Sequence, residues 1–411
     1  MESSESDLSD AEAREGIVHD SLPSGSEREL IEYYFNRGLT YRHITLMLGK
    51  HHGIDINERT LKRRLKDYGL RKRDAVNADL VERVRDLILL EICTGPDSLS
   101  GYRTMWHVLR LRHNIHVPRR LVESLMREVD PRGVEIRKHR SLRRRMYVSP
   151  GPNFCWHIDG YDKLKPYGFC IHGCVDGFSR RILWLEVQRS NKNPQLTAQY
   201  FFNNVKAAHG CPARVYTDRG TENGITAAMQ CHLRAEGVDE HAGGKAHKYV
   251  KSVRNQRIEG YWSHFRKQRS SWWIDFFADL HESDILDLTS EIHTEALWFC
   301  FADILQDDLD KVKDYWNSHR IRKSKHATVS GVPDMMYFPP EEFGAIDCLY
   351  PVSDKLREME NKLQEMSGED ETDPVWEEYF QYVMERNSLS HPTSIFEAGK
   401  LFEKLVRFAK G

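Results

Sequence analysis

Three acidic residues stand out because their types and local contexts could support metal-dependent chemistry. Asp159 lies in WHIDGYDKL, Asp218 in VYTDRGTEN and Glu259 in NQRIEGYW. Carboxylate oxygens are the ligands that Mg²⁺ and Mn²⁺ prefer. Two such ions can activate an oxygen nucleophile, neutralise a reacting phosphate and stabilise a leaving oxygen, as cleavage of a phosphodiester requires. Most single Asp or Glu residues are exposed and idle, so the prediction of a metal site depends on the three acids together.

Hydrophobic patterning predicts an α/β domain that positions these acids. Strands are expected at residues 154–159, 168–176, 180–187 and 213–218, and helices at residues 197–210 and 224–237. A hairpin turn at Asp176 and Gly177 joins the second and third strands. The first strand ends at Asp159 and the last delivers Asp218, and strand ends are where α/β sheets place their sites. Residues 243–252 are expected to form a loop rich in glycine and lysine.

A long helix is expected to begin near Val253 and to carry the third acid. Its apolar residues recur at helical spacing and should face the core, namely Ile258, Tyr261, Trp262 and Phe265. Glu259 is displaced from this stripe by about 100 degrees along the helix. We therefore expect Glu259 on a rim that it shares with Asn255, Ser263 and Arg266, where it could look into a cleft.

The region before this domain is helical, and residues 26–75 read as a helix-turn-helix. Apolar stripes, Gly38 at the end of the first helix and Thr40 at the start of the second delimit its helices. The third helix starts near Asn57 and carries five basic residues, which are Arg59, Lys62, Arg63, Arg64 and Lys66. Such a helix could enter a DNA major groove, and the alternative is a small three-helix bundle with a solvated basic face.

A second helical unit is expected at residues 76–135, with Met105, Val108 and Leu109 on its apolar stripe. A basic linker follows at residues 136–153, where Pro and Gly break regular structure. Its cations are Arg137, Lys138, Arg140, Arg143, Arg144 and Arg145. This run could neutralise DNA phosphates, act as a nuclear-import signal or stay solvated, and the first two uses are compatible.

Composition limits the remaining possibilities. The chain has 60 Lys plus Arg against 62 Asp plus Glu, a near-neutral total that hides strong segregation of charge along the chain. Residues 1–25 read as a disordered acidic tail, and no apolar run is long enough to span a membrane. The eight cysteines lack CxxC spacing and fit a reduced protein; a zinc site at Cys170 and Cys174 would need two more ligands.

The quoted motifs, with the IHGCVDGFSRRILWL hairpin, resemble the core of retroviral-type integrases and their DDE transposase relatives. The resemblance covers roughly residues 30–340. It implies an α/β fold with an RNase H-like mixed five-stranded sheet and flanking helices at residues 154–340, preceded by all-α helix-turn-helix units. A long amphipathic helix near residues 297–322 should pack on this core, a Pro-rich turn should follow at residues 331–340, and an acidic helical region should close the chain at residues 341–411.

By this resemblance Asp159, Asp218 and Glu259 would be the catalytic metal ligands for two Mg²⁺ or Mn²⁺ ions. The nearby acids Asp162 and Glu222 are not expected to be ligands. The resemblance also implies DNA as partner, a homo-oligomer, a nuclear location, and neither membrane nor organic cofactor. Further DNA contacts are expected at Lys245, Lys248, Lys251, Asn255 and Arg266.

Two features depart from the retroviral pattern: the second gap between the acids is longer, and the HHCC zinc module is absent. The expected function is two-metal cleavage and strand transfer on DNA. One alternative is a domesticated, non-transposing DNA-binding or regulatory protein that keeps the fold, and another is a structure-selective nuclease.

Overall fold

The computed structural model describes residues 22–71, 74, 76–94, 100–131, 134, 149–323, 329–366 and 374–410. Most of the acidic tail expected at residues 1–25 lies outside these residues. The same holds for the six cations of the basic linker and for a break in the C-terminal region at residues 367–373.

The first helical unit consists of α2 (Glu27–Asn36), α3 (Tyr41–His52) and α4 (Glu58–Asp67). Each helix begins at a side-chain cap, because Ser26, Thr40 and Asn57 each accept a hydrogen bond from a backbone N–H of the first turn. The predicted apolar stripes are buried together, including Leu30, Ile31, Tyr34, Phe35, Ile44, Met47, Leu48, Leu61 and Leu65. The three predicted helices and their starting points are therefore confirmed.

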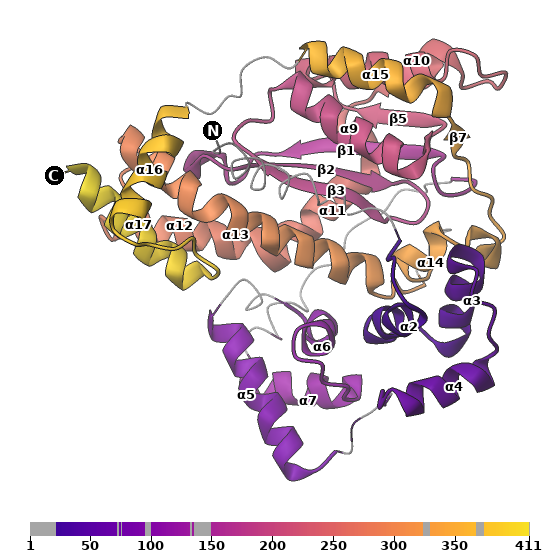
Figure 1. The fold of residues 1–411 in the computed structure, drawn as a ribbon, viewed down its shortest axis with the longest axis horizontal. Coiled ribbons are helices and arrows are strands. Elements are labelled where there is room, and N and C mark those ends of the chain that lie inside the picture. The colour runs from indigo at the N-terminus through magenta and orange to yellow at the C-terminus, as the bar shows by residue number, and fades with distance from the viewer. Residues whose placement is uncertain are drawn as a thin grey trace, which may run out of the picture.

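The second helical unit consists of α5 (Ala78–Thr94), α6 (Tyr102–Leu111) and α7 (Arg119–Val129). Met105, Val108 and Leu109 are buried in its core, as their spacing predicts. The Arg110 guanidinium, 4% exposed, donates to the carbonyl oxygens of Phe35 at 2.6 Å and Asn36 at 3.1 Å. Because these carbonyls end α2, Arg110 caps that helix and joins the two units, which lie side by side below the sheet in Figure 1.

The α/β domain contains the predicted mixed five-stranded sheet. Its strands are β1 (Cys155–Tyr161), β2 (Cys170–Asp176), β3 (Ile182–Gln188), β5 (Arg214–Thr217) and β6 (His247–Tyr249), in the order β3-β2-β1-β5-β6. The first three strands are antiparallel, whereas β5 runs parallel to β1 and β6 runs parallel to β5. Two expectations were wrong: β1 continues two residues past Asp159, and the segment expected to be a loop contains β6.

Helices cover both faces of the sheet (Figure 1). One face packs against α9 (Pro194–Ala208), α10 (Gly224–Leu233) and α15 (Ser353–Met366) around a core that includes Trp156, Trp184 and Phe201. The other face packs against α11 (Gln256–Phe265), α12 (Ser271–Glu282) and α13 (Glu291–Ser318). A π-helical turn, η6 (Arg266–Ser270), joins α11 to α12. The predicted burial of Ile258, Tyr261, Trp262 and Phe265 on α11 is confirmed.

The C-terminal region completes the same fold. Helix α13 packs on the sheet as predicted, and α16 (Pro374–Arg386) and α17 (Ile395–Lys410) pack on α13 and bury Phe380 and Phe402 in the same core. The expected Pro-rich turn contains a short helix, α14 (Pro333–Tyr337), whose Met335 enters the core of the first helical unit. A second, two-stranded sheet pairs β4 (Gly210–Cys211) with β7 (Tyr350–Pro351).

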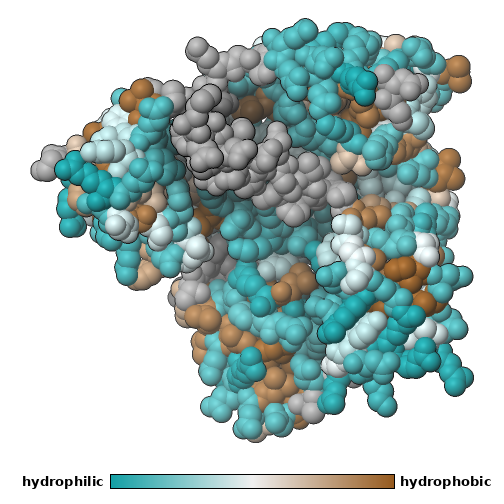
Figure 2. All heavy atoms as spheres, in the orientation of Figure 1, coloured by the Kyte–Doolittle hydropathy of each residue, from teal (hydrophilic) through white to brown (hydrophobic). Residues whose placement is uncertain are grey.

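The face of the molecule in Figure 2 is mainly polar, and the cysteines are thiols rather than disulfides. Hydrophilic residues cover most of the face in Figure 2, and a hydrophobic patch lies over α5, where Leu89 and Leu90 are exposed. Every cysteine is a free thiol, and Cys170 and Cys174 are buried. Within the described ranges we find no helix with the length and apolarity that crossing a membrane requires.

Candidate active site

The sheet brings Asp159 and Asp218 to neighbouring positions. Strands β1 and β5 are parallel and hydrogen-bonded, with His157 opposite Tyr216. Asp159 lies two residues beyond His157, and Asp218 lies two residues beyond Tyr216. Because side chains alternate along a strand, both acids continue the same row at the carboxyl end of the parallel pair.

Glu259 approaches the same place from the first turn of α11. All three acids are half-buried. Burial, and then the negative charges of Glu259 and Asp218, together raise the pKa of Asp159 to about 8. Burial and the charge of Asp218 also raise the pKa of Glu259. The three carboxylates are therefore close enough to repel one another, as side chains that share a cation would be.

Trp262 holds Asp159 in place. Its indole N–H donates to Asp159 Oδ2 at 3.0 Å, and the ring lies over Gly173, which pairs with Asp159 across β1 and β2. A Cβ atom at Gly173 would come within 2.9 Å of the indole, so only glycine permits this approach. Trp262 is one turn after Glu259 on α11, and its contact with the sheet therefore fixes two of the three acids relative to each other. The sequence predicted Trp262 only as a core residue.

Asn255 is buried, which corrects its prediction as a rim residue that contacts DNA. Its side chain is 1% exposed, and its amide donates to the Ile158 carbonyl oxygen at 2.8 Å. Its Oδ1 therefore accepts from His157 Nδ1 at 2.7 Å, which sets the proton of the neutral imidazole on Nδ1. Burial lowers the pKa of His157 to about 3. Asn255 thus joins the start of α11 to the strand that carries Asp159.

Asp218 is held by the loop that follows it. Its Oδ1 accepts hydrogen bonds from the Gly220 N–H at 3.0 Å and from Asn223 Nδ2 at 2.9 Å. The same Asn223 amide donates to Glu222 at 3.0 Å. Burial and the charges of Asp218 and Asp162 raise the pKa of Glu222, so this acid is also near the site. Asp162 is exposed and accepts from Asn191 Nδ2 at 2.7 Å.

The three carboxylates suit a hard divalent cation because they offer only oxygen ligands and lack basic partners. In their present positions, no group of three or more His, Cys, Asp and Glu side chains in the described part of the chain could hold one ion. Mg²⁺ is commonly bound through one or two carboxylates, with waters and substrate phosphates completing its shell. Two of the three carboxylates would therefore be enough ligands from the protein.

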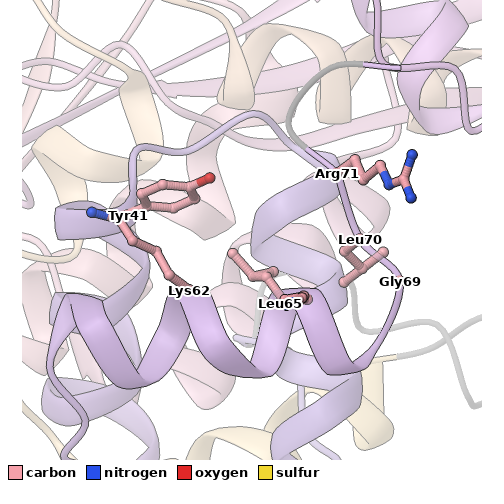
Figure 3. Close-up of a pocket in the computed structure, with 7 residues that line it drawn as sticks. Tyr41, Lys62, Leu65, Gly69, Leu70 and Arg71 are labelled. Atoms are coloured by element: carbon pink, nitrogen blue, oxygen red, sulfur yellow. The ribbon is translucent and has the colours of Figure 1, made fainter. Parts of the chain in front are cut away.

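The predicted basic residues lie in two surface regions. On α4, Arg59, Lys62, Arg63 and Lys66 are exposed, whereas Arg64 pairs with Glu27 of α2. In Figure 3 a pocket between the start of α3 and the end of α4 shows Lys62 beside Tyr41, its Nζ 5.4 Å from the ring centroid. Four of the five basic residues of α4 are therefore accessible from solvent.

The other basic region lies on β6 and its flanks. Lys245, Lys248 and Lys251 are exposed on β6 and its flanks. Because Tyr249 pairs with Thr217, β6 lies beside the strand that leads to Asp218, and Lys251 follows at its carboxyl end. Arg266 is half-buried, and its Nη1 atom is buried with no hydrogen-bond partner in the part of the chain that the structure describes. The cations at positions 137–145 lie outside the described residues.

Comparison with known families agrees with this arrangement. Residues 146–337 match a family model described as the integrase core domain. This chain carries an integrase core domain. The match spans the three acids and the five-stranded sheet, and it assigns the fold to the RNase H-like class and the domain to a polynucleotidyl transferase-like superfamily that uses divalent metals and DNA. No curated protein matches the chain.

Proposed function

We propose that this integrase core domain is a DDE-type polynucleotidyl transferase that cuts DNA phosphodiester bonds and joins DNA ends. Asp159, Asp218 and Glu259 would hold two Mg²⁺ or Mn²⁺ ions. The observation that supports this proposal best is the meeting of the three acids: Asp159 and Asp218 lie just beyond the parallel pairing of β1 and β5, and the charge of Glu259 on α11 reaches Asp159.

Bound divalent ions would activate the attacking oxygen, a DNA 3′-hydroxyl in the joining step, and stabilise the leaving oxygen of the target phosphodiester. The chain's own residues prepare the site for this chemistry. Trp262 orients Asp159, and the loop at residues 220–223 orients Asp218. Lys248 lies on β6 and Lys251 just after that strand, which is next to the β5 strand that leads to Asp218, and their charges could bind phosphates that flank the reacting one.

A plasmid assay tests this function without knowledge of the recognised sequence. Wild-type protein with Mn²⁺ should nick supercoiled plasmid and join labelled oligonucleotide ends to it. Asp159→Asn should abolish both products, because removing one ligand charge weakens metal binding. Glu222→Gln is the matched control: it removes a neighbouring acid of the same region and should retain most of the activity.

The result separates the proposed transferase from its rivals. Equal product from wild type and Asp159→Asn would contradict the metal site. Nicking without joining would identify a nuclease of the same fold, and DNA binding with neither product would identify a domesticated, regulatory protein.

We further propose that the protein acts in the nucleus as a homo-oligomer. The basic segment at residues 137–145 supports nuclear import, and the joining of paired DNA ends in this superfamily supports the assembly. Deletion of residues 137–145 should remove nuclear accumulation of a fluorescent fusion, and unchanged accumulation would contradict that part of the proposal.

A further inference from the structure

Three arginines from separate elements meet where the second helical unit touches the catalytic core. Arg103 lies in the first turn of α6, Arg119 begins α7, and Arg320 follows the end of α13. Figure 1 shows α6 directly below the carboxyl-terminal half of α13. Arg119 stacks over Trp106 with its guanidinium carbon 4.1 Å from the ring centroid, which places its charge against α6. We call Arg103, Arg119 and Arg320 the Arg103 cluster.

The cluster gathers positive charge at one place. Besides burial, the charges of Arg103 and Arg320 lower the pKa of Arg119. The adjacent His319 has a pKa lowered to about 4, chiefly by burial, and the charges of Arg103 and Arg119 contribute. His107 is 2% exposed, and its Nδ1 has no hydrogen-bond partner among the described residues. The three guanidinium groups of the Arg103 cluster therefore repel one another in the protein without a ligand.

Two neighbouring arginines, in contrast, have hydrogen-bond or ion-pair partners within the fold. Arg110 donates to two carbonyls at the end of α2, and Arg37 pairs with Asp314 at 3.0 Å. Within the described ranges, no acid pairs with Arg103, Arg119 or Arg320. Arg103 Nε donates only to the Tyr102 hydroxyl, at 3.1 Å. Among the described residues, the three charges thus lack a neutralising carboxylate.

Backbone groups at the same place add to this attraction. Helices α6 and α7 begin at Gly101 and Pro118, and neither start has a side-chain cap. The first N–H groups of a helix without such a cap attract anions, and guanidinium groups match phosphate oxygens with two parallel hydrogen bonds. Arg119 and Arg320 are exposed, and the exposed Arg322 and Lys323 continue the positive surface beyond the cluster. An extended, exposed positive surface of this kind suits a chain of phosphates better than a single small anion.

We propose that the Arg103 cluster binds backbone phosphates of the DNA on which the catalytic core acts. DNA bound there would bridge the second helical unit and the core, because the three arginines come from both. This inference rests on the proposed function, and it assigns DNA contact to residues that the sequence motifs do not identify.

The test is the salt dependence of DNA binding, measured by fluorescence anisotropy with a labelled duplex at several NaCl concentrations. The cluster variant combines Arg103→Gln, Arg119→Gln and Arg320→Gln. Each arginine that neutralises a phosphate should add about 0.9 to the slope of log Kd against log salt, so the cluster variant should have a shallower slope than the wild type. A control variant removes equal charge from distant helices through Arg357→Gln, Arg386→Gln and Arg407→Gln and should keep the wild-type slope. A variant with lysine at the three cluster positions should regain most of the wild-type slope.

Thermal unfolding without DNA gives a second readout. Relief of repulsion should leave the midpoint of the cluster variant at or above the wild-type value, whereas a merely structural cluster would lower it. A wild-type slope in the cluster variant overturns the inference but leaves the proposed function standing. Failure of the wild-type protein to bind DNA overturns both.

Discussion

Asn255 provides the sharpest test of how the active site is supported. Replacement by alanine removes a donor from the Ile158 carbonyl and an acceptor from His157 Nδ1, and both groups are buried. A buried hydrogen bond contributes about 1 kcal/mol, and a group left without its partner adds a desolvation cost of about 1 to 3 kcal/mol. We therefore expect Asn255→Ala to lower the free energy of unfolding by about 3 kcal/mol or more.

Urea unfolding followed by tryptophan fluorescence measures this destabilisation. With a denaturant dependence of about 2 kcal/mol per molar urea, the midpoint should fall by about 1.5 M. Asn204→Ala is the matched control, because its amide makes one half-buried bond to the Tyr200 carbonyl at 3.0 Å on α9. Asn204→Ala should lower the free energy of unfolding by about 1 kcal/mol or less. Equal midpoints for the two variants would refute the bridging role of Asn255.

Three further predictions concern other contacts. Trp262→Phe keeps the packing but removes the bond to Asp159, so calorimetric Mn²⁺ affinity should fall by about tenfold or more with little change in stability. Burial lowers the folded pKa of His172 to about 3, so the unfolded chain binds more protons than the folded one below about pH 6.5; this residue alone should contribute a loss of stability of about 2 kcal/mol between pH 7 and pH 5, and His172→Gln should remove that share of the acid dependence in thermal scans. Gly38→Ala should lower the thermal midpoint more than Gly69→Ala: both glycines have positive φ, but only a Cβ at position 38 would meet Trp106, at 2.8 Å. Three results would contradict these predictions in turn: a higher Mn²⁺ affinity in Trp262→Phe, a steeper loss of stability with acid in His172→Gln, or equal changes of the thermal midpoint in Gly38→Ala and Gly69→Ala.

Local patterns predicted most elements of the fold because local rules govern them. Thr40 and Asn57 start helices because their side chains bond to backbone groups three residues ahead. The buried stripe of α11 follows from helical spacing alone. The hairpin at Asp176 follows from the turn itself, since this buried carboxylate accepts from the N–H groups of Phe178 and Ser179.

Contacts between distant segments explain the errors. Strand β6 has three residues with two exposed, and it is defined only by its pairing with β5, so the lysine-rich sequence carries no strand signal. Asn255 lies one turn before Glu259, so helical spacing predicted it on the same rim. Its side chain is instead buried against β1, where it bonds to the Ile158 carbonyl oxygen. The packing of α16 and α17 against α13 likewise depends on partners far away in the chain.

The meeting of the three acids was predictable only in part. Local patterns indicated strand ends at Asp159 and Asp218, and the family resemblance implied that the three acids act together, but neither gave the parallel register of β1 and β5 or the approach of α11. The bond from Trp262 to Asp159 could not be predicted from either source, because it depends on the absence of a side chain at Gly173 on a third element.

Direct measurement of Mn²⁺ binding tests the central claim that Asp159, Asp218 and Glu259 form one metal site. Electron paramagnetic resonance of free Mn²⁺ during titration with protein should show binding by the wild type, much weaker binding by Asp218→Asn and near-normal binding by Glu222→Gln. Wild-type Mn²⁺ binding by Asp218→Asn, or weakened binding in Glu222→Gln alone, would contradict the proposed site.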